Sequence, residues 1–217
     1  MKKIITTILA SIFLMGTANS EVRMGLSGIY LDVEASGTQT LKTTGTKTNK
    51  THNDSAIAGE IFLESKTADG VVFGIAVIPM DAEVGSSSIS RTDKLTSGAV
   101  TGAQKAAAEF SMHTTLYANI PLSFYDGAYF KLGAGFVKVK STESLVTGAK
   151  YGDEDIKFGT IGIGFERDLS NGMFARIEGA YSDYEEIKLT STGSDATSTI
   201  SGELETISAT VSIGKSF

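Results

Sequence analysis

His52 and His113 are the only imidazoles in the chain, so a nucleophile–base reaction that uses histidine depends on one of them. His113 shares strand parity with Ser111 and Glu109, and these are the residue types of a nucleophile, a base and an acidic partner. Same-face neighbours along a strand lie about 6.5–7 Å apart, which is long for a direct Ser–His hydrogen bond. We therefore expect no catalytic residues and interpret this set as part of a polar strand face.

Other segments carry residue types that are used to bind ligands. His52-Asn53-Asp54 could hold a cation or cap a turn, and we favour a solvated loop because these residues form turns. Gly133-Ala134-Gly135 and Gly162-Ile163-Gly164 lie within alternating runs rather than between a strand and a helix, so the geometry that cradles phosphate is missing. The chain has no cysteine, which excludes disulfides and thiolate metal sites. The sequence thus predicts neither a metal nor a cofactor.

The N-terminus has the pattern of a secretory signal. Lys2 and Lys3 precede an apolar stretch at 4–15, and small residues follow at 16–20. We expect residues 1–20 to be cleaved and residues 21–217 to form one exported domain. The chain has 25 acidic against 19 basic residues, and two of the lysines lie in the signal. That acidity argues against a nucleic-acid partner, because no basic stripe is present to neutralise phosphates.

Three short turns separate the alternating segments. Their residues are Asp69, Gly70, Asp126, Gly127, Asn171 and Gly172, in Asp-Gly and Asn-Gly pairs that can supply two positive-φ residues to a tight hairpin. Between these turns lie Ser/Thr/Gly-rich segments, which we expect to be long loops: 36–55, 84–108, 141–154 and 186–202. Short turns at one end and long loops at the other are expected of a barrel that spans an outer membrane.

Eight segments alternate with period two: 22–34, 56–65, 71–82, 109–122, 128–140, 155–167, 173–185 and 203–217. Most are as long as the roughly 9–11 residues that a tilted strand needs to cross the hydrocarbon layer. We predict an all-β, eight-stranded antiparallel up-and-down transmembrane barrel. The parity of the apolar residues changes within 155–167, which predicts a bulge near Gly159-Thr160. The alanine cluster in 101–109 predicts a short helical turn.

Alternation alone does not decide whether the apolar face meets lipid or a core, so a soluble lipocalin-like barrel is the alternative. The other face carries small residues and few charges, which suits a narrow lumen better than a solvated surface. Its charges come in both signs and could pair across the lumen: Glu60, Glu64, Lys131, Glu166, Arg176 and Glu178. The positions of the aromatic residues predict two belts of rings, one at each membrane interface. One contains Phe62, Phe73, Phe124, Tyr125, Phe130, Phe165, Phe174 and Phe217, and the other Tyr30, Phe110, Phe136, Phe158 and Tyr181.

The signal, the asymmetric pattern of turns and the terminal aromatic strand together resemble the eight-stranded outer-membrane barrels of Gram-negative bacteria. These include the membrane domain of outer membrane protein A, the outer membrane protein X type and the opacity-type proteins. The resemblance implies that Phe217, with Ile213 and Val211, is read by the machinery that inserts barrels, and Lys215 departs from the usual pattern.

The resemblance also implies an outer-membrane protein with both termini in the periplasm and outer-membrane lipids around it. The expected function is that of a structural or surface-interaction scaffold, in which the four long loops present a surface ligand site. A narrow porin-like channel for small solutes is the alternative, and a lipid A-modifying barrel enzyme is less favoured.

Overall fold

The computed structural model describes residues 20–41, 47–79, 81–95, 98–145, 148, 150–192 and 198–217. The predicted signal segment falls almost wholly outside them. The described residues form ten strands: β1 (Glu21–Leu41), β2 (Lys47–Lys66), β3 (Val72–Ile78), β4 (Ala82–Leu95), β5 (Gly98–Pro121), β6 (Ala128–Ser144), β7 (Glu154–Asp168), β8 (Met173–Tyr184), β9 (Ile187–Thr190) and β10 (Ser198–Ser216). A short 3₁₀ turn, η1 (Ser170–Gly172), precedes β8.

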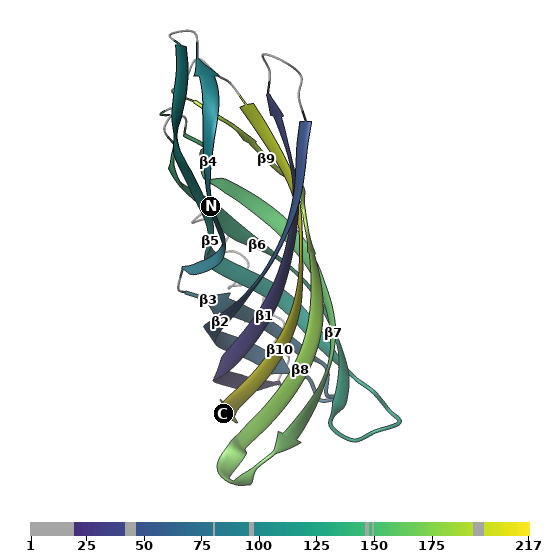
Figure 1. The fold of residues 1–217 in the computed structure, drawn as a ribbon. Coiled ribbons are helices and arrows are strands. Elements are labelled where there is room, and N and C mark those ends of the chain that lie inside the picture. The colour runs from purple at the N-terminus through teal and green to yellow at the C-terminus, as the bar shows by residue number, and fades with distance from the viewer. Residues whose placement is uncertain are drawn as a thin grey trace.

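The strands close into an antiparallel barrel. The order is β1-β2-β3-β5-β6-β7-β8-β10, and β10 returns to pair with β1 along most of its length (Figure 1). β4 continues the path of β3 against β5, and β9 continues that of β8 against β10. β3 and β4 therefore count as one interrupted strand of the barrel, and so do β8 and β9. The ten strands thus make the predicted eight-stranded up-and-down barrel. Pro79, which lacks the N–H that a ladder needs, follows β3 directly.

The two ends of the barrel differ. Short turns lie at one end, which we call the turn end, whereas long strand pairs project from the other, which we call the arm end (Figure 1). The prediction of long loops is wrong for most of 36–55 and 84–108, where β1 pairs with β2 and β4 with β5. The predicted helical turn at 101–109 is part of β5. These arms are rich in Ser, Thr, Gly and Ala and lack a regular alternation of large apolar and polar residues, so the sequence pattern of a half-buried strand is missing there.

The turn residues take fewer positive φ angles than the sequence suggests. Gly70 and Gly127 have φ of 82° and 83°, while their aspartates stay at negative φ. The Thr67 carbonyl accepts a hydrogen bond from Gly70 N at 3.0 Å, as in a hairpin whose left-handed glycine follows a type I turn. Only Asn171 and Gly172 both have positive φ, at 63° and 72°.

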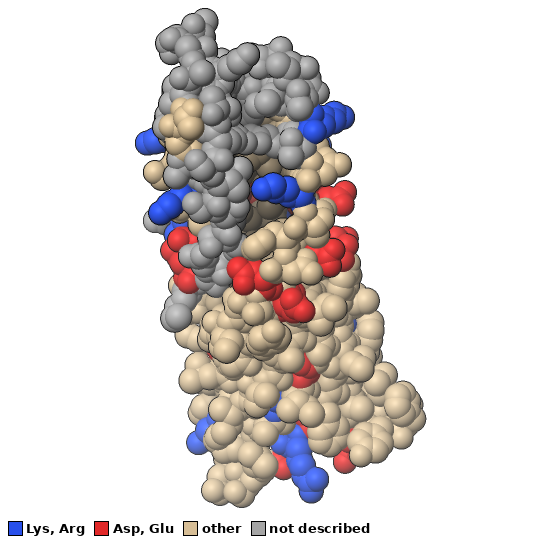
Figure 2. Space-filling model, in the orientation of Figure 1, with Lys and Arg blue, Asp and Glu red and all other residues tan. Residues whose placement is uncertain are grey.

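The outward face of the barrel carries an apolar band around its middle. Exposed side chains of this band include Met24, Leu26, Ile57, Ile61, Phe73, Ile120, Phe130, Leu132, Ile161, Ile163, Ile177, Ile207, Val211 and Ile213. On the visible face of the molecule this zone is almost free of charge, and acidic residues gather just beyond it on the arm side (Figure 2). Three rings at its arm-side edge are exposed as predicted for a belt: Tyr30, Phe136 and Tyr181.

Four of the predicted belt rings instead point inward. Phe62 and Phe174 are buried near the turn end, and Phe110 and Phe158 are buried towards the arm end. The predicted bulge near Gly159-Thr160 is also wrong, because β7 keeps an unbroken register with both β6 and β8. The parity of the apolar residues changes because Phe158 faces the interior whereas Ile161 faces outward.

A bulge does occur in β5. The β5–β6 register shifts between Ser111 and Thr114, and Met112 takes a positive φ of 55°. This shift turns Phe110 inward, against the parity expected from the rest of its strand. Gly135 pairs with Thr115 beside the bulge, where a Cβ would collide with the Thr114 carbonyl oxygen and the Phe158 ring.

We expect Gly135→Ala to lower the free energy of unfolding by about 1–3 kcal/mol, because the added methyl overpacks the bulge. Gly159→Ala on the neighbouring strand is the matched control, since no heavy atom beyond those of its two chain neighbours lies within 4 Å of its Cβ position. Urea unfolding of the two variants in lipid vesicles measures the difference. Equal midpoints would contradict this view of the bulge.

Candidate functional site

Buried charges fill the lumen near the turn end. Glu64, whose side chain is fully buried, accepts two hydrogen bonds from Arg176, at 2.7 and 3.0 Å, and one from the Tyr117 hydroxyl at 2.6 Å. Arg176 also donates to Glu166 at 2.7 Å, and Arg23 lies at the same distance from that carboxylate. Each buried charge in this group therefore has a partner of opposite sign, the condition for holding charges inside a protein.

A second charged group lies one layer further into the barrel. Lys131 donates to Glu178 at 2.6 Å, and the Tyr129 hydroxyl donates to the same carboxylate at 2.8 Å. Ser27 donates to Glu60 at 3.1 Å. The structure thus places all six of the charges expected in the lumen on its inner wall.

Sequence reasoning missed Arg23, Tyr117 and Tyr129 as members of this network. Arg23 has the parity of Ser27, which faces inward, and not that of Met24 and Leu26, so parity alone would have found it. Its guanidinium lies 3.7 Å above the centre of the Phe174 ring. The inward ring of Phe174 therefore acts as a platform for the buried cation.

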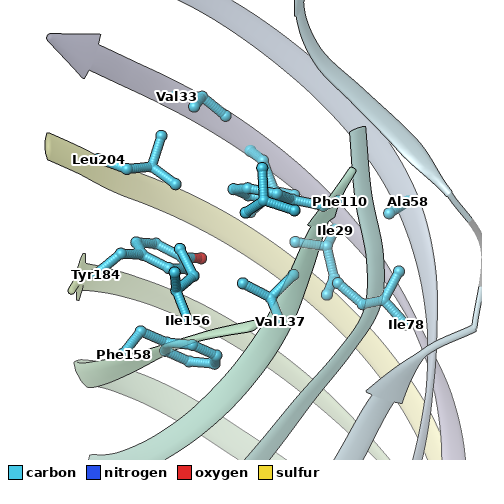
Figure 3. Packing of buried hydrophobic residues seen from close by; sticks show 12 residues of the cluster. Ile29, Val33, Ala58, Ile78, Phe110, Val137, Ile156, Phe158, Tyr184 and Leu204 are labelled. Atoms are coloured by element: carbon cyan, nitrogen blue, oxygen red, sulfur yellow. The ribbon is translucent and has the colours of Figure 1, made fainter. Parts of the chain in front are cut away.

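The arm-side half of the lumen is apolar, in contrast to the polar inner face expected from the sequence. Twelve buried residues from the barrel wall pack there into one cluster, which we call the plug (Figure 3): Ile29, Leu31, Val33, Ala58, Ile78, Phe110, Val137, Val139, Ile156, Phe158, Tyr184 and Leu204. Val137 is completely buried at 0% exposure. A cavity of only about 50 Å³ separates the plug from the charged layer.

His113 belongs to the edge of the plug rather than to a catalytic set. Its Nε2 lies 3.1 Å from the Tyr184 hydroxyl, and its ring stacks on Phe158 with centroids 4.4 Å apart. Ser111 lies beyond the bulge, where its hydroxyl bonds to Asp81. The structure therefore separates the two residues that a Ser–His reaction would need together.

The arms are braced by exposed ion pairs. Lys140 donates to Asp81 at 2.6 Å, and this hydrogen bond, with a second from Ser111, holds the pKa of Asp81 below its usual value. His52 and Asp54 lie in β2, not in a turn, with 4.0 Å between the imidazole and the carboxylate. No group of three potential metal ligands occurs among the described residues.

The turn end opens into a hollow of about 810 Å³, which we call the vestibule. Its floor includes Lys66, Asn119, Tyr129 and Glu166, and residues of the second turn form part of its rim. Asn119 is 2% exposed, and neither polar atom of its amide has a hydrogen-bond partner among the described residues. The wall of the vestibule therefore includes a buried amide whose two polar atoms are not accessible from the hollow.

The assembly-signal residues lie where the barrel closes. Phe217 N donates to the Val22 carbonyl at 2.9 Å, and the Phe217 ring is 68% exposed. Ile213 and Val211 face outward on β10. Their role in insertion stays a prediction.

No protein-family model matches the chain, and no curated protein matches it. Solved structures do match its fold. The outer membrane protease OmpT from Escherichia coli superposes with a TM-score of 0.51 at 8% identity, over 91% of this chain and 97% of the other. The outer membrane protein AlkL, solved in lipid bilayers, gives a TM-score of 0.52 at 14% identity, over 93% and 92%. No helix among the described residues is both long and apolar enough to cross a membrane.

Proposed function

We propose that the protein is a closed outer-membrane scaffold that projects its β-strand arms from the cell surface. Its fold is that of solved outer-membrane β-barrels, so the expected resemblance is confirmed at the level of the fold. The closed lumen carries this proposal, because the plug and the charged network fill the barrel in succession. A barrel whose interior is packed has no permanent pore, and its outward apolar band suits a hydrocarbon environment.

In this proposal the turn end and both termini face the periplasm. Outer-membrane lipids surround the apolar band, the assembly machinery reads Phe217, Ile213 and Val211, and a surface ligand binds to the arms. Function in such scaffolds is usually located in the segments that extend from the barrel. No catalytic role is proposed, because His113 contacts Tyr184 and Phe158 rather than a nucleophile.

Fractionation of a Gram-negative host that expresses the chain tests the location. We expect recovery in the detergent-extracted outer membrane, with a gel mobility that changes on heating. Recovery in the periplasm or the medium would favour the soluble barrel and overturn the proposal.

Planar-bilayer recording tests the closed lumen. We expect no conductance above that of protein-free bilayers, because the twelve buried residues of the plug pack together in the arm-side half of the lumen. Reproducible channels would instead support the small-solute channel, and a lipid A modification that is lost on mutating His113 would support the enzyme.

A further inference from the structure

The small cavity between the plug and the charged layer has a wall of mixed character. Its volume is about 50 Å³. Ile29, Ile78 and Phe158 of the plug, which Figure 3 labels, form part of the wall, and hydroxyl and charged side chains form much of the rest. A cavity needs about 10–15 Å³ to hold one water molecule, so this one has room for about three.

Three hydroxyls of this wall have no partner in the protein. They belong to Thr115 of β5, Ser182 of β8 and Thr210 of β10, all of them at most 8% exposed. No hydrogen bond joins any of the three to another of the described residues. Their oxygens also differ from the sealed amide of Asn119, because they keep accessible surface. A buried hydroxyl left unpaired costs free energy, so these groups favour an occupant that forms hydrogen bonds.

Glu60 adds a carboxylate to the same wall. It accepts a hydrogen bond from Ser27 at 3.1 Å, whereas Lys131, the cation of this layer, donates to Glu178 at 2.6 Å. Within the described part of the chain, no ion pair includes Glu60. A carboxylate can accept about four hydrogen bonds, and a buried charge is costly unless it is paired or hydrogen-bonded. The occupant of the cavity should therefore donate hydrogen bonds to Glu60.

We propose that the cavity binds a cluster of about three water molecules, which hydrates Glu60 and satisfies the hydroxyls of Thr115, Ser182 and Thr210. Water suits this wall because it both donates and accepts, and a buried water typically makes about three hydrogen bonds. A metal ion suits it less well, since no three potential ligands come together in the described ranges. The cluster forms a hydrated layer that ends at the plug. The inference concerns the interior of the barrel and does not rest on the location proposed above.

Solid-state NMR of the barrel in lipid bilayers tests the cluster, with magnetisation transferred selectively from water to protein. We expect the side-chain signals of Thr115 and Thr210 to receive it at least threefold faster than the methyl groups of Val137, which is completely buried in the plug. Thr51, exposed in β2, provides the reference for contact with bulk water. Transfer to Thr115 and Thr210 that is as slow as to Val137 would mean a dry cavity and would overturn the proposal.

Variants that fill the cavity assign the signal to it. Thr115→Leu places an apolar side chain in the cavity and should slow the transfer to Thr210 at least threefold, whereas Thr51→Leu should leave that transfer unchanged. If Thr115→Leu leaves it unchanged as well, the water lies elsewhere and the proposal fails. A heat-dependent gel shift verifies folding, and Ser182→Leu fills the cavity from the opposite wall if Thr115→Leu does not fold.

An exchange of the buffer cation separates water from a bound ion. Replacing Na⁺ with choline should leave the NMR signal of the Glu60 carboxylate carbon unchanged, because water remains available in both buffers. A signal that shifts saturably with the Na⁺ concentration would mean that the cavity holds the ion, contrary to the proposal.

Discussion

Replacing Glu64 with alanine is expected to lower the free energy of unfolding by about 3–5 kcal/mol, the largest effect of any single charge in the barrel. The Glu64 carboxylate accepts two hydrogen bonds from Arg176 and a third from the Tyr117 hydroxyl, and its side chain is fully buried. Without it, Arg23 and Arg176 share Glu166 alone, and one buried cation lacks compensation. Urea titration in lipid vesicles, followed by the fraction with folded gel mobility, measures the loss.

Glu186→Ala is the matched control for Glu64. Glu186 lies 2.7 Å from Lys188, the same distance as between Glu64 and Arg176, but both partners are exposed. An exposed pair contributes about 0–1 kcal/mol. If Glu64→Ala lowers the free energy of unfolding as little as Glu186→Ala does, then water reaches the network and the charged layer does not close the lumen.

A double variant separates the cost of an unpaired cation from the net contribution of the pair. Glu64→Leu with Arg176→Leu removes one charge of each sign and leaves Arg23 with Glu166. We expect it to be more stable than Glu64→Ala, because no buried cation is left in excess.

The barrel was predictable from the sequence because its alternation is long and its turns are short. Parity also located the charges on the inner wall, since the side chains of a strand alternate strictly between two faces. Glu64 and Arg176 are 112 residues apart, and their contact depends on the closure of the sheet. The parity of residues in the sequence cannot predict which of the inward charges contact one another across the lumen.

The plug was not predictable for a different reason. Ile156 and Phe158 are apolar residues on the inner face, and an apolar residue in a membrane strand is first assigned to lipid. Phe110 points inward because the bulge at Met112 changes the parity of its strand. No glycine or proline at the bulge marks this change in the sequence. The buried amide of Asn119 could not be predicted either, because neither its burial nor its lack of hydrogen-bond partners can be read from the sequence.

Phe158→Ala is expected to destabilise the barrel by about 3–5 kcal/mol, the usual cost of removing a buried ring and leaving a cavity. Phe158 is 5% exposed, and its ring centroid lies 4.4 Å from that of His113 and 4.9 Å from that of Tyr184. Each strand around the plug is hydrogen-bonded to a neighbouring strand along both of its edges. The barrel wall therefore cannot move far into the vacated space. Urea titration in vesicles measures this loss in the same way as for Glu64.

Phe136→Ala is the control, because Phe136 is 39% exposed on the outward face of the adjacent strand β6. Acyl chains can fill the space that this ring leaves, so we expect a smaller loss than for Phe158. Phe158→Ala should also leave bilayer conductance at background, because the charged layer around Glu64 still closes the lumen on the turn side. Equal losses for the two phenylalanines would mean that the plug is loosely packed. A new conductance in Phe158→Ala would mean that the plug alone closes the barrel, and that the charged layer is permeable to water and ions.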